Sequence, residues 1–197
     1  MKPGLKYALF AVLAVLLFAG AAAAYKHLTA AATVPPSPPG SSSASSAGSE
    51  ANGSVRKNQA PDFTVTDGSG AAVRLSDFFG QPIILNFWAT WCPPCRSELP
   101  DFDKLYRQYG TSVRFMMIDL TDGYRETAES VKEFVSKNDY TFPVYYDDHG
   151  SAANAYRVSS IPFTVVIDKN GNMHKTHLGA MSAEAIKNLI QSVAEVK

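Results

Sequence analysis

Cysteine is almost absent from this chain. Only two cysteines occur in 197 residues, Cys92 and Cys95, and they stand three positions apart. A disulfide that stabilises an exported domain usually closes a long loop, because a long loop removes more entropy from the unfolded chain. A bond across two intervening residues closes almost no loop. A structural role therefore explains this pair poorly, and redox or metal chemistry explains it better.

The chain also lacks an excess of charge of either sign. It carries 18 Lys and Arg against 18 Asp and Glu, and it has no basic run. A protein that binds nucleic acid by neutralising phosphates needs a cationic surface. We therefore expect no nucleic-acid partner.

Charged residues are missing from residues 7–25. As a helix this segment spans roughly 28 Å, close to the ~30 Å of a bilayer core, and Lys2 and Lys6 before it predict that the following chain lies outside the membrane. A cleaved signal peptide is the alternative, because residues 9–18 are compactly apolar and the alanines at 22–24 fit a cleavage site. Residues 1–28 are therefore assigned to a membrane anchor or signal peptide. Under either assignment, the rest of the chain is exported across the membrane.

Apolar residues are scarce in the next segment. Of the 22 residues at 33–54, 15 are Pro, Ser or Gly. Such a composition buries too little apolar surface to offset the entropy of ordering, which predicts a disordered linker over residues 29–57. It would let a tethered domain reach partners near a membrane.

Residues 58–197 have the composition of a globular domain, and their periodicity predicts a mixed sheet with helices on its faces. Asn170-Gly171 is a strong hairpin signal between the last two strands, and Ser182 is a helix cap. The expected strands are 63–65, 73–75, 83–89, 113–119, 142–146, 163–168 and 173–178, and the expected helices are 93–109, 126–137, 151–156 and one that begins after Ser182.

Cys92 falls between the buried strand 83–89 and the helix that follows. Pro93 and Pro94 occupy the first turn, where backbone N–H groups have no partner within the helix and proline is tolerated. Cys95 then lies one turn on, on the same side as Cys92, so that a disulfide can form. The positive end of the helix dipole stabilises a thiolate. We expect Cys92 to be the exposed nucleophile and Cys95 the buried resolving thiol.

Several motifs occur in order along residues 58–195. They are Trp91-Cys-Pro-Pro-Cys95 after a hydrophobic strand, Pro100 eight residues beyond Cys92, Ser160-Ile161-Pro162-Phe163 before another strand, and Asp168-Lys-Asn-Gly171 followed by Gly179. Together they resemble the thioredoxin superfamily, and most closely its membrane-tethered TlpA/ResA-like branch.

The resemblance implies an α/β thioredoxin fold, in which a mixed central sheet is flanked by helices. An N-terminal β-hairpin and an inserted α/β segment at 119–147 resemble the additions of this branch. The resemblance also implies that the loop with Ile161 and Pro162 faces the cysteines, that Pro162 is cis, and that the loop pairs with the backbone of a substrate. No organic cofactor is implied.

Two polar positions separate this chain from thioredoxin itself. Thioredoxins carry a buried aspartate as proton acceptor where this chain has Asn86, which cannot take a proton; Asn86 either orients groups near Cys95 or is a satisfied polar residue in the strand. Glu98 fits a glutamate of the branch and is a candidate proton relay, whereas a solvated carboxylate or a cap for Arg96 is the alternative. Trp91 is a candidate for the partner groove.

A copper or zinc chaperone that uses the two cysteines is the rival of another class. His174 and His177 are the obvious further ligands, but positions three apart on a strand point to opposite faces. We therefore assign no metal site. A peroxidase of related fold is disfavoured because Ala89 stands where its threonine is expected.

The sequence thus predicts an extracytoplasmic thiol–disulfide oxidoreductase that reduces exported client proteins, with a disulfide-introducing oxidase and a copper chaperone as alternatives. By resemblance, the clients are the haem-attachment cysteines of apocytochrome c or the copper-site cysteines of an oxidase subunit. A transmembrane thiol reductase would supply the electrons.

Overall fold

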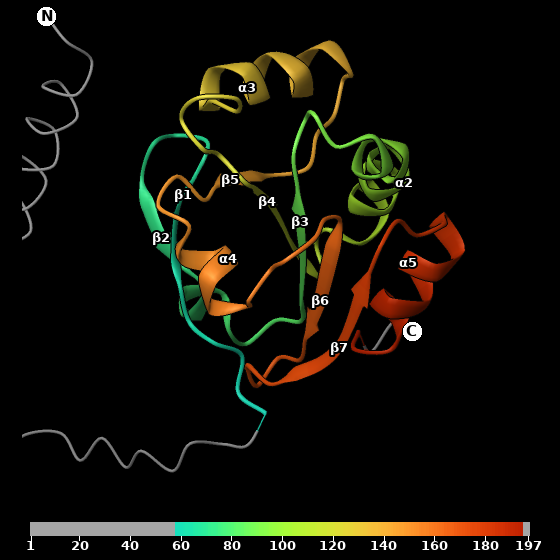
Figure 1. Cartoon of the computed structure of the whole chain (residues 1–197). Helices are drawn as coiled ribbons and strands as arrows, with labels where there is room; N and C mark the ends of the chain where they lie inside the picture. Colours follow the sequence, from blue (N-terminus) through green and yellow to red (C-terminus); the bar gives the residue numbers. More distant parts are fainter. Residues whose placement is uncertain (1–57, 195–197) are drawn as a thin grey trace, which may run out of the picture. The chain divides into compact units, whose positions relative to one another are not determined.

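The computed structural model describes residues 58–194; the predicted anchor or signal peptide (1–28) and linker (29–57) lie outside the described residues, as do residues 195–197. The described part is a mixed seven-stranded sheet in the order β2-β1-β5-β4-β3-β6-β7, with helices against it (Figure 1). Between residues 58 and 194, no helix is long and apolar enough to cross a membrane.

Strands and helices alternate along most of the chain, as the sequence predicts. The strands are β1 (Thr64–Thr66), β2 (Ala72–Arg74), β3 (Ile83–Trp88), β4 (Arg114–Asp119), β5 (Val144–Tyr146), β6 (Phe163–Ile167) and β7 (Met173–Leu178). The helices are the 3₁₀ turn η1 (Leu75–Phe78), α2 (Pro93–Tyr109), α3 (Ala128–Lys137), α4 (Ser151–Ala155) and α5 (Ala183–Gln191).

The sheet is built around β3, whose six residues are all buried. β3 pairs parallel with β4 and antiparallel with β6, and β4 pairs parallel with β5. A run of apolar residues without alternation is what a strand covered on both faces requires. The β1–β2 hairpin joins the sheet through one pair of residues, Thr66 and Tyr146. The predicted thioredoxin fold, N-terminal hairpin and inserted α3–β5 segment are therefore confirmed.

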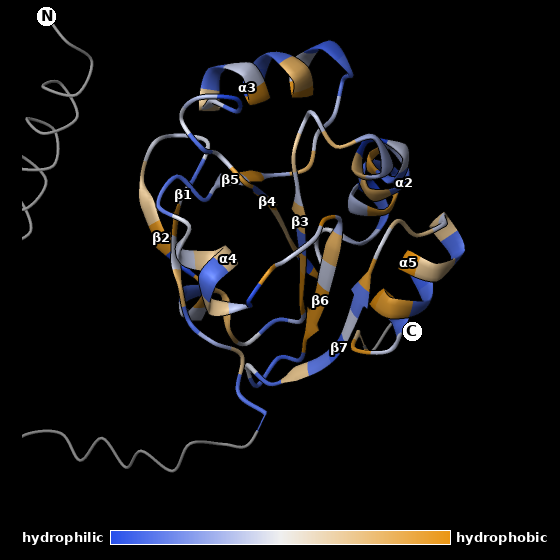
Figure 2. Cartoon of the chain, in the orientation of Figure 1, coloured by the Kyte–Doolittle hydropathy of each residue, from blue (hydrophilic) through white to orange (hydrophobic). Residues whose placement is uncertain are grey.

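Alternate side chains of β3 enter two separate cores. Ile84 and Trp88 pack in a cluster with residues of α2, α3 and α5, and Leu85 and Phe87 pack in a second cluster with residues of η1 and α4. Figure 2 shows the matching pattern, in which the central strands are largely hydrophobic and α5 has one hydrophobic side. Trp88 is fully buried.

The hairpin at Asn170-Gly171 has the predicted place between β6 and β7. Gly171 has a φ of +79°, and its N–H donates to the Asp168 carbonyl at 3.0 Å. A β-carbon on Gly171 would lie 2.8 Å from the Phe79 ring, so both the backbone conformation and the packing call for glycine here.

Several predicted boundaries differ from the structure by one residue, and two differ by two residues. The helix expected from residue 126 begins at Ala128, because the Thr127 side chain accepts the Ser130 N–H and caps the helix there. Glu126 therefore lies before the helix. The strand expected from residue 142 begins at Val144, directly after Pro143, which has no N–H to donate to a neighbouring strand.

Candidate active site

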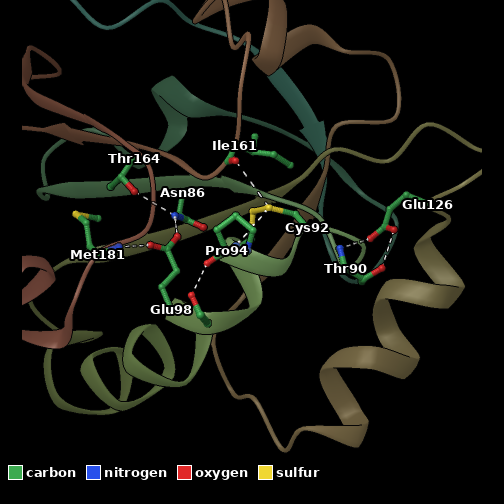
Figure 3. Close-up of a disulfide and its surroundings, with 11 residues drawn as sticks. Asn86, Thr90, Cys92, Pro94, Glu98, Glu126, Ile161, Thr164 and Met181 are labelled. Carbon is green, nitrogen blue, oxygen red and sulfur yellow. Dashed lines mark hydrogen bonds between the residues drawn. A yellow bond between two sulfur atoms is a disulfide. The ribbon is translucent and has the colours of Figure 1, made fainter.

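The two cysteines form a disulfide at the N-terminus of α2 (Figure 3). Their Cα atoms lie 5.3 Å apart. Cys92 is the N-cap residue, with extended backbone dihedrals, and Pro93 and Pro94 occupy the first helical positions as predicted. The sequence places the redox pair here because β3 ends just before the one stretch whose prolines suit a first helical turn.

One backbone donor of this first turn reaches the Cys92 sulfur. The N–H of Cys95 lies 3.3 Å from Cys92 Sγ. Pro93 and Pro94, the residues between them, have no N–H. In the reduced enzyme we expect this turn to offer a Cys92 thiolate one backbone hydrogen bond, from Cys95, together with the helix dipole.

The cysteines differ in their access to the surface. Cys92 lines a groove of about 450 Å³, whereas Cys95 is 0% exposed in the core beneath. Cys92 itself is only 3% exposed, so the prediction of an exposed nucleophile is wrong in degree. The groove is lined by Trp91, Cys92, Pro93, Pro94, Leu120, Val158, Ser159, Ser160 and Ile161.

The loop before β6 covers Cys92. The Ile161–Pro162 peptide bond is cis, as predicted, and the Ile161 carbonyl oxygen lies 3.8 Å from Cys92 Sγ. The Pro162 carbonyl accepts the N–H of Gly179 at 2.9 Å, which ties the loop to the end of β7. Ile161 thus lies against the sulfur and forms part of the groove wall, whereas pairing of this loop with a substrate backbone stays a prediction.

Glu98 is buried beneath the disulfide. It is 1% exposed; its Oε1 accepts from Asn86 Nδ2 at 2.9 Å and its Oε2 accepts the Met181 N–H at 2.9 Å. Burial raises the pKa of Glu98 to about 7, although both hydrogen bonds lower it. The alternative of a solvated carboxylate is wrong, and so is that of a cap for Arg96, whose guanidinium lies 5.5 Å from the Phe134 ring centroid.

Asn86 connects Glu98 to the neighbouring strand. Its Nδ2 also donates to Thr164 Oγ1 at 3.1 Å, while its Oδ1 is buried and receives no hydrogen bond. A carboxyl with a pKa of about 7, one turn along α2 from Cys95, can take up and release a proton near neutral pH. Asn86 itself cannot, so Glu98 is the better candidate for a proton relay to the resolving thiol.

Trp91 is 40% exposed at the rim of the groove, where the sequence predicted it. The Arg125 guanidinium carbon lies 3.7 Å from the centroid of its ring. This stacking was not predicted, because the two residues are far apart in sequence and no local motif links them.

Sequence reasoning also missed Glu126. This residue is 1% exposed, and its carboxylate accepts both the backbone N–H and the hydroxyl of Thr90, at 2.8 and 2.7 Å. The only sequence signal is the Thr127–Ser130 capping pattern, which starts the helix after Thr127 and leaves Glu126 outside it.

The sequence from residue 57 to residue 176 matches the model of the AhpC/TSA family. The chain belongs to this family. The thiol-disulfide oxidoreductase ResA of Geobacillus kaustophilus is 38% identical over 135 residues, which cover 68% of this chain and 75% of that relative. The thioredoxin-like protein YneN of Bacillus subtilis is 36% identical over 129 residues, with 66% and 75% covered.

Solved structures give the same result. The crystal structure of StoA from Bacillus subtilis has a TM-score of 0.58 and 30% identity, and covers 66% of this chain and 96% of its own. The exposed lipoprotein thioredoxin Etrx1 from Streptococcus pneumoniae has a TM-score of 0.58 and 33% identity, with 66% and 98% covered. With its Cys92–Cys95 pair, the chain is a thiol–disulfide oxidoreductase of this thioredoxin-like type.

Proposed function

We propose that this oxidoreductase acts as a reductant of disulfides in exported client proteins, on the outer side of the cytoplasmic membrane. The observation that carries the direction is the single backbone donor at Cys92 Sγ, from Cys95. A thiolate with few donors is less stabilised, which disfavours the reduced enzyme and favours transfer of its electrons to a client.

The reaction begins with the reduced enzyme. The Cys92 thiolate attacks a client disulfide, a Cys92–client S–S bond forms, the client S–S bond breaks, and the second client sulfur leaves as a thiolate. Cys95, deprotonated with Glu98 as acceptor, then attacks Cys92 Sγ and releases the other client sulfur. The client gains two electrons, and the enzyme ends with the Cys92–Cys95 disulfide. A transmembrane thiol reductase then returns the two electrons.

The proposed location is supported by the sequence before the domain. An uncharged segment of membrane-spanning length, with lysines on its N-terminal side, predicts a single-pass anchor with the domain outside. The Pro/Ser/Gly-rich linker then supplies reach. By resemblance to the TlpA/ResA-like branch, we take the clients to be cysteines of apocytochrome c or of an oxidase copper site.

A trapping experiment tests this function. In a Cys95→Ser variant the mixed disulfide at Cys92 cannot be resolved, so exported clients are expected to accumulate as adducts that a reductant releases. The Cys92→Ser variant is the matched control and should trap none. If adducts formed only with cytoplasmic proteins, the proposed location would be wrong. If client cysteines became more reduced when the protein is deleted, the protein would be an oxidase of its clients.

A further inference from the structure

The loop between β4 and α3 is held in shape by its own hydrogen bonds. Asp122 Oδ1 accepts the backbone N–H groups of Tyr124, Arg125 and Glu126 at 2.9, 2.6 and 2.9 Å. The Glu126 carbonyl accepts the N–H groups of Asp122 and Gly123 at 3.2 and 3.0 Å. The loop therefore presents the side chains of Arg125 and Glu126 in fixed directions.

Both side chains contact the segment that leads into Cys92. The Glu126 carboxylate accepts two hydrogen bonds from Thr90, and Arg125 stacks on Trp91. Thr90 and Trp91 are the two residues before Cys92. The position of the sulfur is thus linked to the position of one buried carboxylate (Figure 3).

A second buried carboxyl lies beside Glu126. Asp119, at the end of β4, is 0% exposed; its Oδ1 accepts from Thr121 Oγ1 at 2.8 Å, and its Oδ2 receives no hydrogen bond. The Glu126 carboxyl lies close enough to act on Asp119 and raise its pKa. Two carboxyl groups can form a hydrogen bond only when one of them carries a proton. Placed on Asp119 Oδ2, that proton gives this atom a partner.

The surroundings favour the protonated form of Asp119. Burial raises its pKa to about 8, and the charges of Glu126 and Asp122 add to the effect while the hydrogen bond from Thr121 opposes it. On the β5 side the phenol of Tyr146 interacts with Asp119, and its own pKa is raised.

Helix α3 also faces this region. The charge of Glu129 on this helix helps to raise the pKa of Tyr146. The Lys132 ammonium lies 5.7 Å from the Tyr146 ring centroid. Lys132 is therefore placed against the tyrosine ring.

We propose that Asp119 and Glu126 are positioning residues for disulfide exchange, because one proton shared between their carboxyl groups holds Glu126 where it accepts both Thr90 donors and so fixes the approach to Cys92. The proposal concerns the exchange reaction itself and is independent of client, location and direction. When Asp119 ionises, the pair loses its hydrogen bond and gains repulsion between two buried charges. The segment at Thr90 and Trp91 then loses its fixed acceptor.

The first test compares the wild type with Asp119→Asn. Asparagine keeps an acceptor for Thr121 and a donor toward Glu126, but it does not ionise, so it imitates the protonated aspartate at every pH. Exchange rates with a small aromatic disulfide are measured from pH 6 to pH 9, and each is divided by the thiolate fraction of Cys92, obtained from alkylation rates. The ratio of wild type to variant should be near one at pH 6.

At pH 9 a group with a pKa of about 8 is about nine-tenths ionised. The ratio of the wild-type rate to the variant rate should therefore fall several-fold, and by no more than about tenfold. Asp103→Asn is the matched control: Asp103 is a mostly buried carboxylate bonded to Arg107 and Thr141, and its pKa is lowered. This control should leave the profile above pH 7 unchanged. A pH-independent ratio for Asp119→Asn would overturn the proposal.

A second measurement does not depend on activity. Carboxyl carbon NMR of the oxidised protein should show a resonance that titrates near pH 8 and disappears in Asp119→Asn. In Glu126→Gln the amide can donate to Asp119 and the charge at position 126 is removed, so the same resonance should titrate at a lower pH than in the wild type. An Asp119 resonance that titrates near pH 4 in the wild type would show that no proton is shared.

Discussion

The side-chain amide of Asn86 donates a 2.9 Å hydrogen bond to the Glu98 carboxylate, and neither residue is more than 1% exposed. A neutral amide here supports the charged form of Glu98 without adding a charge. A thioredoxin-like aspartate at position 86 would instead place two carboxyl groups side by side in the core. The two residues therefore have different roles: Glu98 is the titratable group, and Asn86 orients it.

The Asn86→Asp variant should be less stable than the wild type, and the loss should grow with pH. Two buried carboxyls in contact raise each other's pKa, so ionisation of the second costs folding free energy. We expect a loss of about 1–3 kcal/mol at pH 8 and less at pH 5, from urea unfolding of the oxidised protein. Asn188→Asp, an exposed position on α5, is the control. An equal loss at both pH values would argue against contact between the carboxyls.

Replacing Glu98 with Gln should slow the second half of the reaction and spare the first. Glutamine cannot accept the proton of Cys95, so release of the mixed disulfide should slow by at least about tenfold at pH 8. Its pH profile should also lose an ionisation near 7, the pKa to which burial raises Glu98. Rapid-quench kinetics separate the two steps, and Glu184→Gln is an exposed control. Slowing of both steps alike would mean that Glu98 is structural.

The fold was predictable because its signals are local. The buried run of β3, the two prolines of the first turn of α2 and the Asn170-Gly171 turn each lie within a few residues. The contacts that complete the site are not local: Glu98 meets the Met181 N–H 83 residues away, and Thr90 meets Glu126 36 residues away. Periodicity carries no information about such pairs, because they depend on how packed elements bring side chains together.

The near burial of Cys92 also depends on a distant element, the Ile161 loop, but Cys92 still lines the groove whereas Cys95 lies in the core. In the reduced protein Cys92 should be alkylated at least about tenfold faster than Cys95 near neutral pH, because it lines the groove and caps the helix. Mass spectrometry of timed iodoacetamide reactions measures this. In the Cys92→Ser variant, Cys95 should still be alkylated slowly. Faster labelling of Cys95 than of Cys92 in the wild type would reverse the assigned roles.

The oxidised protein should lose stability as pH rises from about 4.5 to 8. Glu98 and Asp119 have folded pKa values of about 7 and about 8, above their ordinary values, so the folded state binds more protons than the unfolded state in this range. Their contribution to folding stability is complete below the ordinary pKa values and is lost as the pH rises through the folded pKa values. Urea unfolding at pH 5, 7 and 9 measures the slope, which Asp119→Asn should reduce.

Acid should also lower the folding stability, through carboxylates whose pKa values are lowered in the folded state. Hydrogen bonds lower the pKa values of Asp103 and Asp168. Their stabilisation is present above their ordinary value of 3.8 and is lost as pH falls through the folded values. Stability should therefore be greatest near pH 4 to 5. A maximum at pH 8 would contradict the raised pKa values of the two buried acids.

The Cys92–Cys95 couple should have a low reduction potential. Cys95 supplies a backbone N–H to Cys92 Sγ, whereas Pro93 and Pro94 supply none, so the thiolate of the reduced enzyme is weakly stabilised and its disulfide is hard to reduce. The helix dipole acts in the other direction, but every active-site helix that begins at its nucleophile has it, so it does not set this enzyme apart. Equilibration with glutathione of known poise should give a potential near the thioredoxin value of about −270 mV.

Replacing Pro93 or Pro94 with Ala tests the cause of that potential. Each substitution restores one N–H to the first turn, and the potential should rise because the reduced form gains a donor for its thiolate. Pro100→Ala is the matched control, because it restores an N–H in the same helix but two turns beyond the sulfur. A wild-type value near the DsbA potential of about −120 mV would identify an oxidant and overturn the proposed direction of electron flow. An unchanged potential in both proline variants, with a low wild-type value, would keep the direction and remove only the explanation.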